Sequence, residues 1–217
     1  MAVVDGQLYF APGVLMKDLN LDDPDFLLWA FEQRVKGFFL APIRTLEQSS
    51  DAQEGALFGG ALLVAALVEA IARVETGSTA QGTLIREWLG THVAAFRATV
   101  VLRSGRTGDA ENKSIADVFE YRFRNGLAHN GYVASLGRLS QAIREPVSVS
   151  GDIVVINPFA LADAVENSFE AFAADLRAGR RDIRRFAYHV AEQFRDEVHR
   201  SRTEAAATSD ETGSAER

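Results

Sequence analysis

One short segment of the chain combines residue types that can do phosphate chemistry. Arg124 stands five positions before His129, and Asn125 follows the arginine directly. An arginine stays cationic and can hold the anionic oxygens of a phosphate, whereas a histidine can exchange a proton near neutral pH. We therefore take Arg124, His129 and Asn125 as candidate catalytic residues for phosphodiester cleavage.

Local signals predict that this segment ends a helix. Ser114 or Asn112 could cap its start, and Asn130-Gly131 after the histidine is a common helix stop. His129 would then lie in the last turn. In an ideal α-helix, Arg124 and His129 are about 140° apart around the axis and roughly 7.5 Å apart along it. Both could reach one groove if a symmetry mate closed its other side.

Two neighbouring residues could support these groups. Glu120 lies one helical turn before Arg124 and could pair with its guanidinium, either to orient it for catalysis or only as a structural ion pair. Tyr132, just past the histidine, could stack on a base or anchor the loop that follows. Asn125 could bind a phosphate or only fix the turn. Glu120 and Tyr132 are candidates for supporting roles or substrate binding.

The run Arg124-Asn125-Gly126-Leu127-Ala128-His129 resembles the Arg-x4-His signature of the HEPN family (higher eukaryotes and prokaryotes nucleotide-binding domain). The resemblance is loose over residues 50–200 and good over residues 119–177. There the motif is followed by a short β segment, by Asn157-Pro158 and by an amphipathic helix from Phe159 to Arg177. It implies an all-α fold, a helical bundle of about five to six helices with a small β-hairpin inserted after the motif helix.

The resemblance also implies an activity. Many HEPN proteins are metal-independent endoribonucleases that act as homodimers, in which the Arg and His of both copies meet in one groove. The chain would then cleave RNA by 2′-OH transesterification, without a metal or cofactor, as a defence or toxin-like protein with an antitoxin or another operon partner. Two alternatives stay open: a catalytically inactive RNA- or nucleotide-binding module, and a helical protein-interaction module.

Composition narrows the class of protein. The 217 residues are 47% hydrophobic and include no cysteine, which excludes disulfides, cysteine-ligated zinc and thiol catalysis. A net charge of −7 argues against a protein that coats nucleic acid non-specifically. The first residues lack the pattern of a signal peptide, so we expect a cytoplasmic protein. The longest uncharged apolar segment, Gly55 to Val68, is too short to span a bilayer and predicts a buried helix without membrane contact.

The remaining pattern predicts one helical domain with two terminal segments. We expect an extended segment at residues 1–22, a single HEPN-like domain at 23–202 with a hairpin at about 146–157, and a disordered tail at 203–217. The glycines at 55, 59 and 60 inside one expected helix suggest that another helix packs closely there. The other helices are expected from Pro24 and at about residues 51–76, 83–102, 158–178 and 180–200.

Two further groups of residues could bind ligands. An arginine cluster on the last two helices is either a local RNA surface or a solvated pair of helix faces. It consists of Arg177, Arg180, Arg181, Arg184 and Arg185. The last helix also has possible metal ligands at His189, Glu192, Asp196 and His199. One straight helix cannot direct all four to a single ion, so we expect no metal site.

Overall fold

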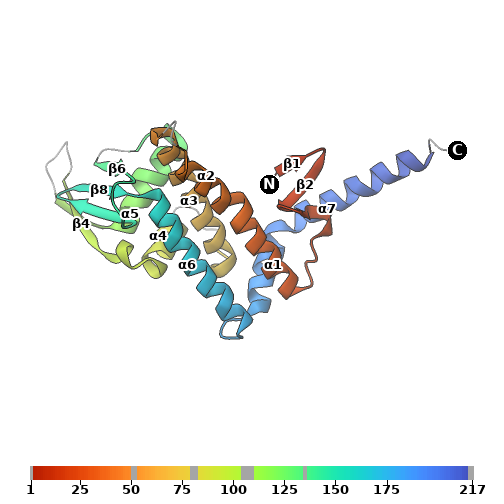
Figure 1. Ribbon diagram of the computed structural model, residues 1–217. Helices are drawn as coiled ribbons and strands as arrows, with labels where there is room; N and C mark the ends of the chain where they lie inside the picture. Colours follow the sequence, from red (N-terminus) through yellow and green to blue (C-terminus); the bar gives the residue numbers. More distant parts are fainter. Residues whose placement is uncertain (1, 50–52, 79–82, 104–109, 134–135, 215–217) are drawn as a thin grey trace. The chain divides into compact units, whose positions relative to one another are not determined.

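The computed structural model describes residues 2–49, 53–78, 83–103, 110–133 and 136–214. The chain divides into two compact units, residues 1–38 with 175–217, and residues 39–174. Helices dominate, but the described strands form three small sheets (Figure 1). The predicted all-α class is therefore wrong, and the fold is mixed α and β.

The first unit contains a small sheet and two helices. Strand order is β1-β2-β3, and both pairings are antiparallel. Asp23 caps the first helix by accepting hydrogen bonds from the backbone N–H groups of Asp25 and Phe26. Pro24 follows at the first helical position, as the sequence predicts. The elements are β1 (Ala2–Val4), β2 (Gln7–Ala11), β3 (Val14–Leu15), η1 (Met16–Asp18), α1 (Pro24–Arg34) and α7 (Ile183–Ser214).

Aromatic contacts hold the first unit together. Phe10 of β2 packs edge-on against Phe194 of α7, with ring centroids 5.0 Å apart. The guanidinium of Arg34 lies over both rings and donates to the carbonyl of Phe10. The segment expected to be extended thus forms strands with a buried side. Helix α7 continues to Ser214, through the stretch that the sequence predicts to be disordered.

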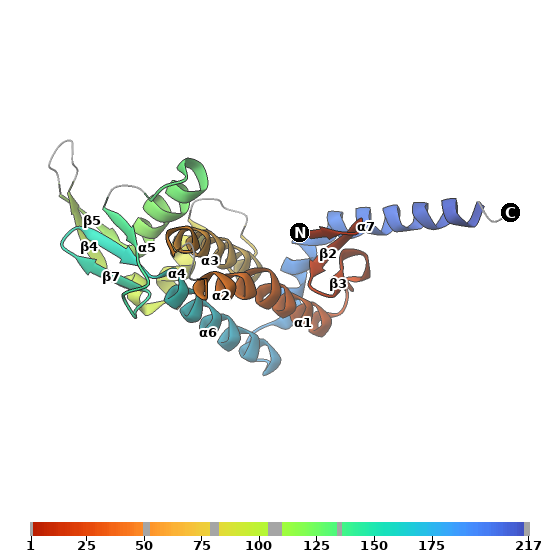
Figure 2. The ribbon, with the colours of Figure 1, turned by 45° about the horizontal axis from the view of Figure 1, so that its top comes forward.

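Helices make up most of the second unit. A π turn, η2 (Val35–Leu40), leads into α2 (Ala41–Glu47), α3 (Gln53–Thr76), α4 (Leu84–His92), η3 (Ala94–Arg97) and α6 (Pro158–Arg177). Helices α2, α3 and α6 run beside one another (Figures 1 and 2). A Cβ built on Gly59 would lie 3.1 Å from Leu46, and one on Gly60 would lie 3.0 Å from Phe159. The expected close helix contact is therefore confirmed at these two glycines.

The described residues of the second unit also form five strands. β4 (Thr99–Arg103) pairs antiparallel with β5 (Ala110–Ser114). The other sheet has the order β6-β8-β7 and joins β6 (Gly137–Leu139), β8 (Ile153–Ile156) and β7 (Val147–Ser150). The predicted hairpin is present as β7–β8, whose strands pair antiparallel. The predicted helix over 83–102 is wrong in its second half, because α4 ends at His92 and β4 begins at Thr99.

Helix α3 is long and strongly apolar. Residues Glu54–Thr76 are long and apolar enough to cross a membrane by length and composition, the one such helix in the described part of the chain. Half of its most apolar window is buried inside the structure, and α3 packs on α2 and α4. The core helix of a globular unit has the same properties. The expected cytoplasmic location and the absence of membrane contact stay predictions.

Candidate functional site

The predicted site residues lie on one continuous helical segment of the second unit. It consists of α5 (Ile115–Val118), η4 (Phe119–Arg124) and η5 (Gly126–Asn130), and we call it the motif helix. Ser114 caps its start, because its hydroxyl accepts from the Asp117 N–H while the Asp117 carboxylate accepts from the Ser114 N–H. Gly131 ends it in the left-handed conformation, with φ of 67°. Both ends lie where the sequence predicts them.

The motif helix is wound differently from the expected α-helix. η4 and η5 are π-helical, and the Asn125 N–H donates to the carbonyl of Glu120, five residues earlier. When hydrogen bonds run over five residues, side chains five apart lie about one turn apart. Arg124 and His129 therefore lie nearer to one face than the 140° of an ideal α-helix implies. The angle between the two side chains around the helix axis is thus smaller than expected, which favours one site for both.

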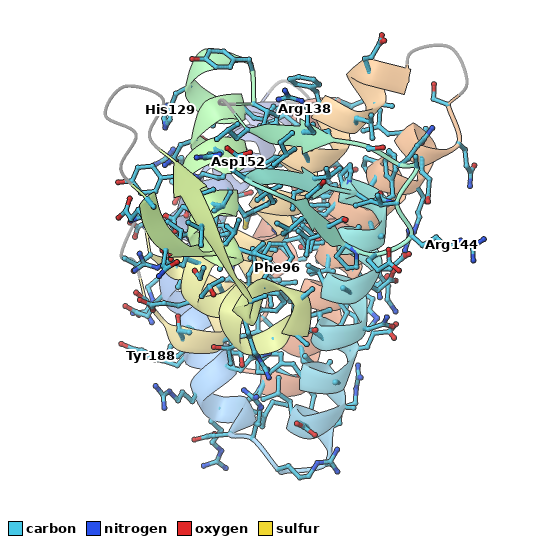
Figure 3. All side chains as sticks on the ribbon, turned by 90° about the vertical axis from the view of Figure 1, so that its left-hand side faces the viewer. Phe96, His129, Arg138, Arg144, Asp152 and Tyr188 are labelled. Carbon is cyan, nitrogen blue, oxygen red and sulfur yellow. The ribbon has the colours of Figure 1, made fainter. Side chains whose placement is uncertain are left out.

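Burial divides the motif helix into two faces. Five of the accessible or half-buried residues, which we call the motif face, are Tyr121, Arg124, Asn125, Ala128 and His129, at spacings of three, four, seven and eight residues from the first. Arg122 is also half-buried and is described separately below. On the buried side, Phe119 stacks on Phe123 with centroids 5.9 Å apart and packs edge-on against Phe96. Figure 3 labels His129 and Phe96. All three predicted catalytic residues thus share one accessible face.

Arg124 has two hydrogen-bond partners. Its Nη1 donates to the Asn125 Oδ1 across 2.9 Å, and its Nη2 lies 3.3 Å from the Glu69 Oε2 of α3. Glu69 also pairs with Arg73, at 2.7 Å. Burial alone would raise the pKa of Glu69, but the hydrogen bonds and charges of Arg73 and Arg124 outweigh it and lower that pKa. Asn125 and Glu69 together hold the guanidinium in place.

Glu120 has a different place from the one expected. Its side chain is buried, with the residue only 5% exposed, and the ion-pair partner of Arg124 is Glu69 instead. Burial raises the pKa of Glu120, although the charges of Arg86 and Arg124 oppose this. A hydrogen bond from the backbone of Arg86 also reaches its carboxylate. Glu120 therefore lies behind the motif face and acts on Arg124 through its charge.

Two tyrosines border the predicted catalytic residues. Tyr132 is 56% exposed, so its ring does not anchor the following loop by burial. Tyr121 is 74% exposed and lies on the motif face, three residues before Arg124. Tyr121 was not among the residues predicted from the sequence. Extending the helical spacing backwards from Arg124 and Asn125 would have found it, because residues three and four apart share a face.

A further cation lies beside the motif face. Arg122 has its Nη1 buried without a hydrogen-bond partner among the residues that the structure describes. Burial lowers its pKa, and the charge of Asp152 in the β7–β8 turn opposes the shift. Figure 3 labels Asp152 and, on β6, Arg138. An unpaired buried N–H costs free energy, so Arg122 is the strained polar group of this region.

The other candidate groups do not form a site. In the arginine cluster, Arg177 pairs with Glu32, and both Arg180 and Arg181 pair with Asp175. These ion pairs favour the interpretation of a solvated helix surface. Across the described ranges, no group of three or more metal-ligating side chains is gathered, including those of α7. His92 stacks on Trp88 and lies 3.4 Å from a Glu75 carboxylate oxygen, a packing role inside the unit.

The comparisons with known proteins found no match. No protein-family model matches the chain, and neither the curated proteins nor the solved structures provide a match. The HEPN resemblance therefore depends on the residues of the motif helix and stays a prediction. The side chains of the motif face are therefore the basis for a proposed function.

Proposed function

We propose that this protein is a metal-independent endoribonuclease of HEPN type whose site is the motif face. The observation that supports this most directly is the shared accessible face of Arg124, Asn125 and His129 on a helix with π turns. π turns occur often at functional sites. A cation that binds phosphate oxygens and an imidazole that can move a proton can together catalyse cleavage of a phosphodiester.

The reaction needs a base and a stabiliser of negative charge. His129 would take the proton of a ribose 2′-OH, and the 2′-oxygen would attack the adjacent phosphorus. The bond to the 5′-oxygen breaks, and this leaving oxygen takes up a proton from water or from a protonated histidine. Arg124 would hold the non-bridging phosphate oxygens, on which charge accumulates. Asn125 positions the guanidinium through its Oδ1.

One chain supplies one histidine on the motif face. The reaction needs a base for the 2′-OH and an acid for the leaving oxygen. If both act together, they are two imidazoles, or one imidazole and water. We propose that two copies form a homodimer in which both motif faces border one groove. An antitoxin or another operon partner, in a defence or toxin-like system, would then act by covering that groove.

One observation favours a second candidate, an RNA-binding module without turnover. Arg124 is already ion-paired to Glu69 and hydrogen-bonded to Asn125. A guanidinium held in this way can still contact phosphate with its remaining donors, and binding requires no more than that. Binding of RNA without cleavage would establish this alternative.

The substrate assay separates these candidates. The purified protein is incubated, in the presence of a chelator, with a single-stranded RNA and with DNA of the same sequence. The proposed enzyme cuts the RNA and leaves 2′,3′-cyclic phosphate or 3′-phosphate ends, and it spares the DNA, which lacks the attacking hydroxyl. Cleavage of DNA, or RNA products with 5′-phosphate ends, would rule out this mechanism.

A further inference from the structure

Tyr121 has an exposure that packing does not explain. It is 74% exposed, more than any other tyrosine, tryptophan or phenylalanine that the structure describes. The other two aromatic residues of η4 are buried: Phe119 packs edge-on against Phe96, and Phe123 stacks on Phe119. An aromatic ring in water forgoes the stabilisation that burial provides. This ring is therefore free to accept a flat ligand.

The neighbours of Tyr121 favour a nucleotide as that ligand. Arg124 and Asn125, three and four residues later, share its face. A ring beside a cation and an amide presents a surface for a base and contacts for the phosphate next to it.

We infer that Tyr121 is the stacking platform for one unpaired base of an RNA strand lying along the motif face. This inference rests on the proposed function and identifies its substrate as single-stranded. A base in a duplex is covered by its neighbours, whereas an unpaired base offers its face to an aromatic side chain. His129 lies eight residues, about two helical turns, further along the helix, so one RNA strand can reach both side chains.

The test measures binding without cleavage. The probe is a fluorescent 2′-O-methyl oligouridylate, which has no free 2′-hydroxyl to attack. Tyr121→Ala should weaken its binding by roughly 5- to 100-fold, the range expected for loss of one base–aromatic stack. Tyr121→Phe should bind as the wild type does, because the ring is kept. Tyr188→Ala is the matched control, since Tyr188 is 59% exposed on α7 of the other unit.

A second set of probes locates the stacked base. An abasic residue is placed at successive positions of the same oligonucleotide. The wild type should lose affinity most strongly at one position, and Tyr121→Ala should show no such position.

The contrary outcomes separate this inference from the proposed function. If Tyr121→Ala binds the probe as the wild type does while Arg124→Ala binds it weakly, the stacking platform is refuted and the RNA site stands. If Tyr121→Ala changes only the sedimentation coefficient, the ring is a contact between copies, and the inference is again refuted. If the wild type binds no single-stranded RNA, both proposals fail.

Discussion

Arg124 of the motif helix pairs with Glu69 of α3, with 3.3 Å between Nη2 and Oε2. Arg73 shares the same carboxylate at 2.7 Å. An RNA phosphate approaching Arg124 must compete with Glu69, which also keeps the guanidinium in place. The carboxylate therefore opposes binding while it favours an ordered site.

The first prediction concerns this competition. Glu69→Gln removes the negative charge and keeps an oxygen acceptor, so RNA affinity should rise a few-fold because Arg124 and Arg73 are less neutralised. The cleavage rate at saturating RNA should fall, because Arg124 is held less firmly. Glu54→Gln, on the exposed part of the same helix, is the control. An unchanged or weaker affinity in Glu69→Gln would show that Glu69 does not compete with phosphate.

The second prediction uses the opposite pKa shifts of two glutamates. The pKa of Glu120 is raised above 4.5, so its contribution to stability is present below that value and is lost as pH rises through the folded-state pKa. The pKa of Glu69 is lowered, so its contribution is present above 4.5 and is lost as pH falls through the folded-state pKa. On going from about pH 4 to about pH 7, Glu120→Gln should gain stability relative to the wild type, and Glu69→Gln should lose it.

Urea unfolding at the two pH values measures this difference. The change for Glu69→Gln should be at most about 1 kcal/mol, because the ion pairs are partly exposed to solvent. Two variants that shift in the same direction with pH would contradict the assigned environments.

The third prediction tests the contact between α3 and α6. Gly60→Ala places a methyl group 3.0 Å from the buried Phe159 ring, which would have to shift within the packed core, so the variant should lose about 1–3 kcal/mol of stability. Gly90→Ala in α4 meets nothing within 4 Å and should gain up to about 1 kcal/mol from helix propensity. Thermal unfolding of both variants checks the pair. A Gly60→Ala protein as stable as Gly90→Ala would contradict the packing.

The fourth prediction concerns the end of α7. Arg202 donates to the backbone carbonyls of Lys17 and Leu19, at 2.9 and 2.8 Å. Truncation after Arg202 keeps these bonds and should leave the melting temperature unchanged. Arg202→Ala in the full chain should lower the free energy of unfolding by about 1 kcal/mol. A truncated chain that melts several degrees lower would show that residues 203–217 stabilise the fold.

Local signals in the sequence predicted much of the motif helix. The Ser114 cap, the stop at Gly131 and the β7–β8 hairpin each depend on a few neighbouring residues, and all are present. The glycines at 59 and 60 indicate close packing, because glycine destabilises a helix and is expected inside one where a neighbouring element comes close. The placement of Arg124, Asn125 and His129 on one helix follows from the same local pattern.

Features that depend on distant residues were not predicted. β5 reads Ala-Glu-Asn-Lys-Ser and has no strand pattern, so it exists through its pairing with β4. Glu69 is 55 residues from Arg124, and only the fold brings them together. The π turns of η4 and η5 have no simple signature in residue type, which is why an ideal α-helix was expected.

The most direct test of the proposed ribonuclease site is RNA cleavage by matched variants in the presence of a chelator. His129→Ala should abolish cleavage, because it removes the proposed base. His129 is exposed, so the free energy of unfolding should change by less than about 0.5 kcal/mol. Arg124→Ala should abolish cleavage as well and should weaken RNA binding more than His129→Ala does, because the guanidinium acts in both the ground state and the transition state. Full cleavage by a folded His129→Ala protein would contradict the proposed site.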